Sequence, residues 1–213
     1  MKVLVFCDDL HHPAATARAG LEPLIAAGRH AFDWIEDASG WNPGRLPGYD
    51  AVLLAKSNVC SARNSAPWLA GETEDALGAY VRAGGGLVAV HSGTASYVHW
   101  PAVRAVLGGA FLRHPPPAPV TLEPRPGHPL CAGVDGPFAV HDEHYEMILD
   151  DAGADVFLHA RSAHGVQPAG WARREGRGRV VVLTPGHFPE VWRHASMQRL
   201  IANALAAASR PPG

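Results

Sequence analysis

Short apolar runs alternate with segments of helical character along much of the chain, and this alternation limits the fold more than any other feature of the sequence. Residues 51–55 (AVLLA) and 86–90 (GLVAV) contain no polar side chain. This is typical of parallel strands covered by helices on both faces, whereas half-exposed antiparallel strands alternate apolar and polar residues. The pattern therefore predicts an α/β fold with a doubly wound, mainly parallel sheet and helices on both faces.

The length of 213 residues fits one domain over residues 1–213, because a chain of this size can bury a full core. Helical segments are expected at residues 21–27, 72–83 and 196–208. The proline-rich stretch at about 112–130 is expected to be a loop or peripheral hairpin with an edge strand. Residues 209–213 are expected to form a frayed tail.

Charge and cysteine content exclude several classes of protein. The net charge of -2 comes without a basic stripe, which argues against nucleic acid as a partner. No apolar run approaches the length of a membrane span, and no secretory leader is recognisable. The three cysteines are widely spaced, which suggests neither a disulfide framework nor a thiolate zinc site. We expect a cytoplasmic protein, and a homo-oligomer remains open.

His91 directly follows the apolar run 86–90, and Ser92 and Gly93 come next. Ligands of open parallel sheets bind outside the carboxyl ends of the strands, so this position favours a functional histidine. The frame 89–93 resembles half of a G-x-S-x-G nucleophile elbow, with an imidazole at its apex and Ala89 in place of the first glycine. The alternative is a hydrogen-bonded histidine with a structural role alone.

A second group of titratable residues occurs at 141–147 (HDEHYEM). Asp142 or Glu143 can orient an imidazole and raise its basicity, and the hydroxyl of Tyr145 can bind a substrate hydroxyl. A solvated polar turn that caps a helix is the other interpretation of this cluster.

Two further loops are predicted to share the rim of His91. His187 follows the strand predicted at 180–183, and Pro185 and Gly186 would form the turn that presents it, with Glu190 as an orienting carboxylate. His12 lies in the loop after the first strand, where the aspartates at 8 and 9 can alternatively cap a helix. His114 is a further loop histidine, with a structural role as its alternative.

The motifs GGGLVAVHSG, GGAFLRHP, HPL, HDEHYEM and GRGRVVVLTPGH occur in the order seen in the trehalose-utilization, or ThuA-like, family, which the chain resembles over nearly its whole length. The resemblance implies a class I glutamine amidotransferase-like, flavodoxin-like fold. It also implies that His91 stands where amidotransferases place their catalytic cysteine, and that His187 stands at their histidine position. A glutaminase needs a thiolate on that turn, so no glutaminase activity is expected.

Three functions from different classes remain open. The first is an enzyme of carbohydrate metabolism, as the resemblance implies, acting on trehalose, a related disaccharide or a keto-sugar by histidine and carboxylate acid/base chemistry. The second is a metal-dependent hydrolase or isomerase on the same rim, because imidazole and carboxylate side chains suit a divalent metal such as zinc. No motif in the sequence requires a cofactor. The third is a non-catalytic sugar-binding protein. The expected catalytic residues are His91, Asp142, Glu143 and His187, and the expected sugar-binding residues are His12, Ser92, Gly93, His114 and Tyr145.

Overall fold

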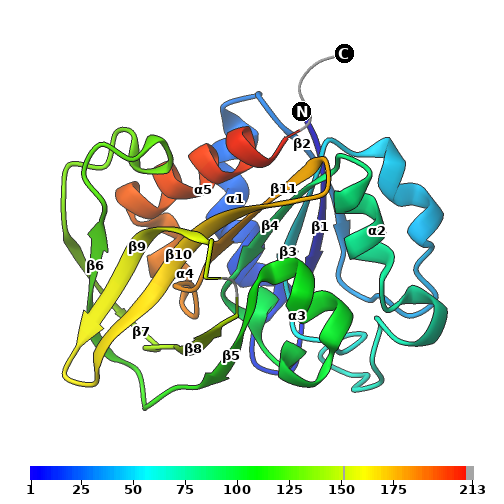
Figure 1. Ribbon diagram of the computed structural model, residues 1–213, viewed down its shortest axis with the longest axis horizontal. Coiled ribbons are helices and arrows are strands. Elements are labelled where there is room, and N and C mark those ends of the chain that lie inside the picture. Colours follow the sequence, from blue (N-terminus) through cyan, green and yellow to red (C-terminus); the bar gives the residue numbers. More distant parts are fainter. Residues whose placement is uncertain (151, 210–213) are drawn as a thin grey trace.

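The computed structural model describes residues 1–150 and 152–209. Within these ranges, a nine-stranded sheet runs through the molecule in the order β2-β1-β3-β4-β11-β10-β9-β6-β7 (Figure 1). Neighbours from β2 to β11 are parallel, and neighbours from β11 to β7 are antiparallel. The strands are β1 (Lys2–Cys7), β2 (Ala31–Ile35), β3 (Ala51–Ala55), β4 (Gly86–Val90), β6 (Ala118–Pro124), β7 (Phe138–Asp142), β9 (Asp155–Ser162), β10 (Gly165–Glu175) and β11 (Gly178–Leu183).

The parallel half of the sheet is covered on both faces. Every residue of β3 and β4 is buried, as their wholly apolar sequences predict. Side chains that alternate along these strands enter two separate cores: Leu53 packs on the face of α1 and α5, and Leu54 packs on the face of α2 and α3 (Figure 1). The helices are α1 (Ala14–Ala26), α2 (Ala76–Arg82), α3 (Pro101–Leu107), α4 (Pro189–Arg193) and α5 (Ala195–Ala208).

The predicted doubly wound α/β fold is confirmed, and the parallel strands follow the flavodoxin-like order 2-1-3-4-5. The second half of the sheet differs from the sequence-based expectation. Residues 112–130 contain the end of β5 and all of β6, and β6 pairs with both β7 and β9, so β7 and not β6 is the edge strand. The prolines of β6, Pro119 and Pro124, lie near the two ends of that strand, where a missing N–H disrupts pairing least.

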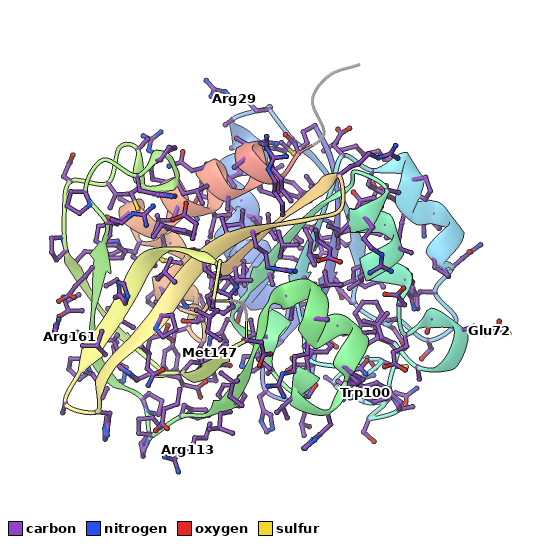
Figure 2. All side chains as sticks on the ribbon, viewed as in Figure 1. Arg29, Glu72, Trp100, Arg113, Met147 and Arg161 are labelled. Atoms are coloured by element: carbon purple, nitrogen blue, oxygen red, sulfur yellow. The ribbon has the colours of Figure 1, made fainter. Side chains whose placement is uncertain are left out.

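A two-stranded antiparallel sheet of β5 (Gly109–Arg113) and β8 (Glu146–Leu149) flanks the large sheet. Arg113, at the outer end of β5, points away from the body of the molecule (Figure 2) and forms an ion pair with Glu146 at 2.8 Å. The segment between β7 and β8 carries Glu143 and Tyr145. This small sheet therefore anchors the loop that brings both side chains to the parallel half.

Two features bear on the ends and the surface of the chain. The helix α5 ends at Ala208, and of the tail expected at 209–213 only Ser209 lies within the described residues. Among the helices described, none combines the length and the apolar character that a bilayer crossing requires.

Candidate active site

His91 is the first residue after β4 and adopts a left-handed backbone conformation, with φ of 48°. Non-glycine residues adopt this region at a cost, and such strain concentrates at functional sites. The chain turns here into a single 3₁₀ turn, His91–Thr94. A Cβ atom at Gly93 would lie 2.0 Å from the carbonyl oxygen of Leu54, so only glycine fits at that position. The turn therefore has the tight strand-to-helix geometry that the half-kept elbow motif predicts.

The imidazole of His91 is fixed on both of its nitrogens. Its Nδ1 lies 2.8 Å from the carbonyl oxygen of Thr184. A carbonyl can only accept, so Nδ1 carries the hydrogen. Its Nε2 lies 2.9 Å from the hydroxyl of Tyr145 and 3.3 Å from Oε2 of Glu143. In the neutral ring, Nε2 therefore presents a lone pair to the site, and Tyr145 donates to it.

His12 lies in the loop after β1 and is oriented by Asp9. The Nδ1 of His12 is 2.7 Å from Oδ1 of Asp9, a buried carboxylate that also accepts backbone hydrogen bonds from His11, His12 and Ser57. Burial alone would raise the pKa of Asp9, but the hydrogen bond and charge of His12 outweigh it and hold the pKa well below its usual range. The other ring nitrogen of His12, Nε2, is buried and has no hydrogen-bond partner within residues 1–150 and 152–209.

Glu143 lies between the histidines. Its Oε2 is 3.3 Å from Nε2 of His91 and 3.2 Å from Nδ1 of His187, and its Oε1 is 3.4 Å from Nε2 of His114. Burial raises the pKa of Glu143, but the interactions with His187 and His91 outweigh burial and lower the pKa well below the usual range. Reciprocally, Glu143 raises the pKa of His187 above 6.5. The loop thus places one carboxylate among three imidazoles.

Asp142 performs a different task from its neighbour Glu143. The last residue of β7, it accepts hydrogen bonds from the backbone N–H groups of Gly186, at 2.7 Å, and His187, at 3.0 Å. Its side chain is buried, and burial raises its pKa. Asp142 therefore holds the loop that presents His187, and its predicted catalytic role stays a prediction.

The remaining predicted residues surround the cluster. Tyr145 stacks on His91, with ring centroids 4.2 Å apart. His114 lies at the outer side, with a side chain 34% exposed, and contacts Glu143. Ser92 and Gly93 are buried in the turn directly after His91. Glu190, which the sequence suggested as the orienting carboxylate of His187, is exposed, whereas Glu143 lies beside that ring.

The described residues contain one cluster of possible metal-ligating side chains, formed by His12, His91, Glu143 and His187. One ligand atom from each of these four side chains lies within 4.8 Å of the other three. The three histidines follow β1, β4 and β11, whose carboxyl ends the parallel topology brings to the same rim, and Glu143 comes from the loop between β7 and β8. The sequence reasoning missed the orienting partners, Asp9 and the carbonyl of Thr184. The three-residue spacing of Asp9 and His12 within one turn was the signal that could have identified Asp9 as the partner of His12. No sequence signal could have identified the carbonyl of Thr184 as the partner of His91.

A cavity of about 390 Å³ borders the loop of His187. Its lining includes Phe188, His141 and His194, from β7 and the segment around α4. Phe188 packs edge-on against His187, with ring centroids 4.6 Å apart. None of the four residues His12, His91, Glu143 and His187 lines this cavity, and Phe188 lies between it and His187.

The family model for trehalose utilisation, ThuA, matches residues 2–208. The chain belongs to the ThuA family. The resemblance recognised in its motifs is therefore confirmed, and in this ThuA protein His91 occupies the elbow at the end of β4. No curated protein sequence matches the chain significantly.

Solved structures similar to this ThuA protein include two ThuA-like proteins. One, from Parabacteroides merdae, has a TM-score of 0.80 and 17% identity, with 100% of this chain and 92% of that chain covered. The other, from Bacteroides uniformis, has a TM-score of 0.75 and 21% identity, with 96% and 89% covered. A GMP synthase-type protein from Thermoplasma acidophilum has a TM-score of 0.58 and 14% identity, with 97% and 93% covered, consistent with an amidotransferase-like fold.

Proposed function

We propose that this ThuA protein is an enzyme of carbohydrate metabolism that transfers protons to and from a disaccharide or keto-sugar at the cluster of His12, His91, Glu143 and His187. Family membership supports the substrate class, because the matching family model is that of trehalose utilisation. The convergence of three imidazoles and a carboxylate supports the chemistry, since such groups are general acids and bases near neutral pH.

One observation carries the proposal: three imidazoles and a carboxylate converge with ligand atoms within 4.8 Å of one another, and two of these imidazoles have opposite electrostatic surroundings. Burial lowers the pKa of His12, whereas the contact with Glu143 raises the pKa of His187. Their ring centroids are only 5.1 Å apart. A pair of titratable groups whose environments separate their pKa values is the arrangement that supplies an acid and a base at one pH. On this basis, His12 would act as the base and His187 as the acid.

His91 and Tyr145 would complete the site. The hydrogen bond to Thr184 keeps the Nε2 lone pair of His91 directed at the cluster. The hydroxyl of Tyr145 now donates its hydrogen bond to that lone pair, and it can donate to a sugar oxygen instead. A cytoplasmic location belongs to this proposal, supported by the free thiols of Cys7, Cys60 and Cys131.

The test is turnover of a panel of trehalose, other disaccharides and their 3-keto derivatives, followed by NMR with wild-type protein. The Glu143→Gln variant should lose a factor of roughly 10² or more in rate, the usual contribution of an acid/base group. The matched control is Glu123→Gln, which alters a carboxylate on β6 that pairs with Arg161 on β9 and should retain the wild-type rate.

Two results would contradict the proposal. The first is sugar binding, detected as a thermal shift, without turnover of any sugar on the panel in the presence or absence of divalent metals. That result would favour a non-catalytic sugar-binding protein. The second is turnover that Glu143→Gln leaves unchanged.

A further inference from the structure

We propose that His12, His91, His187 and Glu143 together bind one divalent transition-metal ion of the zinc class. The inference rests on the proposed function and deepens it, because it names the state in which the site would act on a sugar oxygen. It is carried by the positions of the four ligand atoms, by the hydrogen bonds on the far side of two imidazoles, and by a buried nitrogen without a partner.

The spacing of the ligand atoms suits a small ion. With metal-to-ligand distances of about 2.0–2.2 Å, the ligand atoms of a tetrahedral zinc site are roughly 3.3 Å from one another. Oε2 of Glu143 is 3.3 Å from Nε2 of His91 and 3.2 Å from Nδ1 of His187. All four ligand atoms lie within 4.8 Å of one another, so small side-chain rotations complete the set.

The hydrogen bonds behind the imidazoles are those that metal ligands require. A metal-bound histidine usually donates its other ring N–H to a carboxylate or a backbone carbonyl. His12 donates from Nδ1 to Asp9, and His91 donates from Nδ1 to the carbonyl of Thr184. Both rings therefore direct an unprotonated Nε2 into the cluster, which is the form of imidazole that binds a metal.

The Nε2 of His12 supplies an independent observation. It is buried, it has no hydrogen-bond partner, and its ring lies 4.8 Å from the ring of His91, centroid to centroid. A buried polar atom without a partner costs free energy that native structures usually avoid. An ion at the centre of the cluster would satisfy this nitrogen.

The donor set indicates the class of ion. Three imidazoles and one carboxylate suit zinc, iron or nickel better than magnesium or calcium, which prefer oxygen ligands alone. A bound ion of this class would polarise a hydroxyl or carbonyl oxygen of the sugar if that oxygen entered as a fifth ligand. In that state the histidines hold the ion, and Tyr145 is left beside it as the neighbouring proton donor.

The test uses the full chain, stripped of metal with a chelator and then titrated with Zn²⁺ against a competing chelator. We expect one Zn²⁺ per chain, and the His12→Asn and Glu143→Gln variants should each bind at least tenfold more weakly. The control variant, His159→Asn, alters an exposed histidine on β9 and should bind as the wild type does. Addition of Co²⁺ should give the visible absorption of a four-coordinate site, and His12→Asn should abolish it.

Three results would overturn the inference. They are no stoichiometric Zn²⁺ binding by the wild type, unchanged Zn²⁺ affinity in both His12→Asn and Glu143→Gln, or a loss of Zn²⁺ affinity in these variants no larger than that in His159→Asn. None of these readouts depends on activity. Sugar turnover that persists in excess chelator, together with absent Zn²⁺ binding, would reject the metal site and leave the proposed function standing. Zn²⁺ binding without turnover of any sugar would confirm the metal site and reject the proposed function.

Discussion

The ring of Tyr145 lies over the imidazole of His91, with centroids 4.2 Å apart and planes inclined by 26°, and its hydroxyl lies 2.9 Å from Nε2 of that imidazole. The loop between β7 and β8 and the turn after β4 meet at this contact. Both rings are buried. Tyr145 is thus the protein group that holds a proton on the side of His91 that faces the cluster.

Replacement of Tyr145 by phenylalanine removes this proton and keeps the stacked ring. The free energy of unfolding should fall by about 1 kcal/mol, the net value of one hydrogen bond. Sugar turnover should fall roughly tenfold or more, because the donor beside the cluster is lost. Urea unfolding and turnover of the same preparation test this, and an unchanged rate in Tyr145→Phe would exclude the hydroxyl from the chemistry.

Asp142→Asn tests the role of the buried carboxylate under the His187 loop. An asparagine offers one acceptor oxygen where Gly186 and His187 now find two, so one backbone N–H loses its partner. We expect the free energy of unfolding to fall by about 1–3 kcal/mol. Turnover should fall as well, because His187 is no longer held in place. Asp155→Asn, which alters an exposed carboxylate paired with Arg125, is the control and should cost less. Equal losses in the two variants would contradict the positioning role.

The thiols should not participate in any activity of the protein. Cys7, Cys60 and Cys131 are buried, and burial raises the pKa of Cys7 to about 12. A protonated, buried thiol reacts slowly with alkylating reagents. Mass spectrometry of the native protein after iodoacetamide treatment should show little modification, and sugar turnover should be unaffected. Release of ammonia from glutamine that stops on alkylation would contradict this prediction, because it would show that a cysteine thiol is catalytic.

The contribution of His12 to the stability of the ion-free protein should fall in mild acid, against the opposite contribution of His187, whose pKa is raised. Burial lowers the pKa of His12 below its ordinary 6.5. Between the lowered pKa and 6.5, the His12 side chain binds a proton in the unfolded chain that it does not bind in the folded protein, so its contribution to stability decreases as the pH drops below about 6.5. Urea unfolding in excess chelator at about pH 7.5 and about pH 5.5 measures the loss. His12→Asn should show a smaller loss over this interval than the wild type, and an equal loss would assign the acid sensitivity to other groups.

The rim could be predicted from the sequence because of the parallel strands. Runs such as 86–90 and 180–183 are apolar throughout, so they had to be central strands, and parallel strands share their carboxyl ends. The pattern of apolar runs alone therefore places His91 and His187 on one rim. The same reasoning includes His12, because it follows the first strand.

The sequence could not predict which of Asp142 and Glu143 contacts the histidine cluster and which accepts hydrogen bonds from the backbone of the His187 loop. Successive side chains of an extended segment point in opposite directions. Asp142 therefore turns into the backbone of the His187 loop, and Glu143 turns into the cluster. Either assignment fits the sequence, because it depends on how β7 pairs at the edge of the sheet. That pairing was also hidden, since the prolines of residues 112–130 indicated a loop where β6 lies between two partners.

The most direct test of the account is the substitution His91→Asn. Asparagine is among the non-glycine residues that most often adopt the left-handed backbone of this position, so the exchange adds little backbone strain. Unfolding by urea and turnover of the first active sugar are measured on the same sample. The account predicts a folded protein whose turnover is lower by a factor of roughly 10² to 10⁴. A variant that does not fold, or one that folds and retains the wild-type rate, would contradict the claim that His91 belongs to a catalytic site.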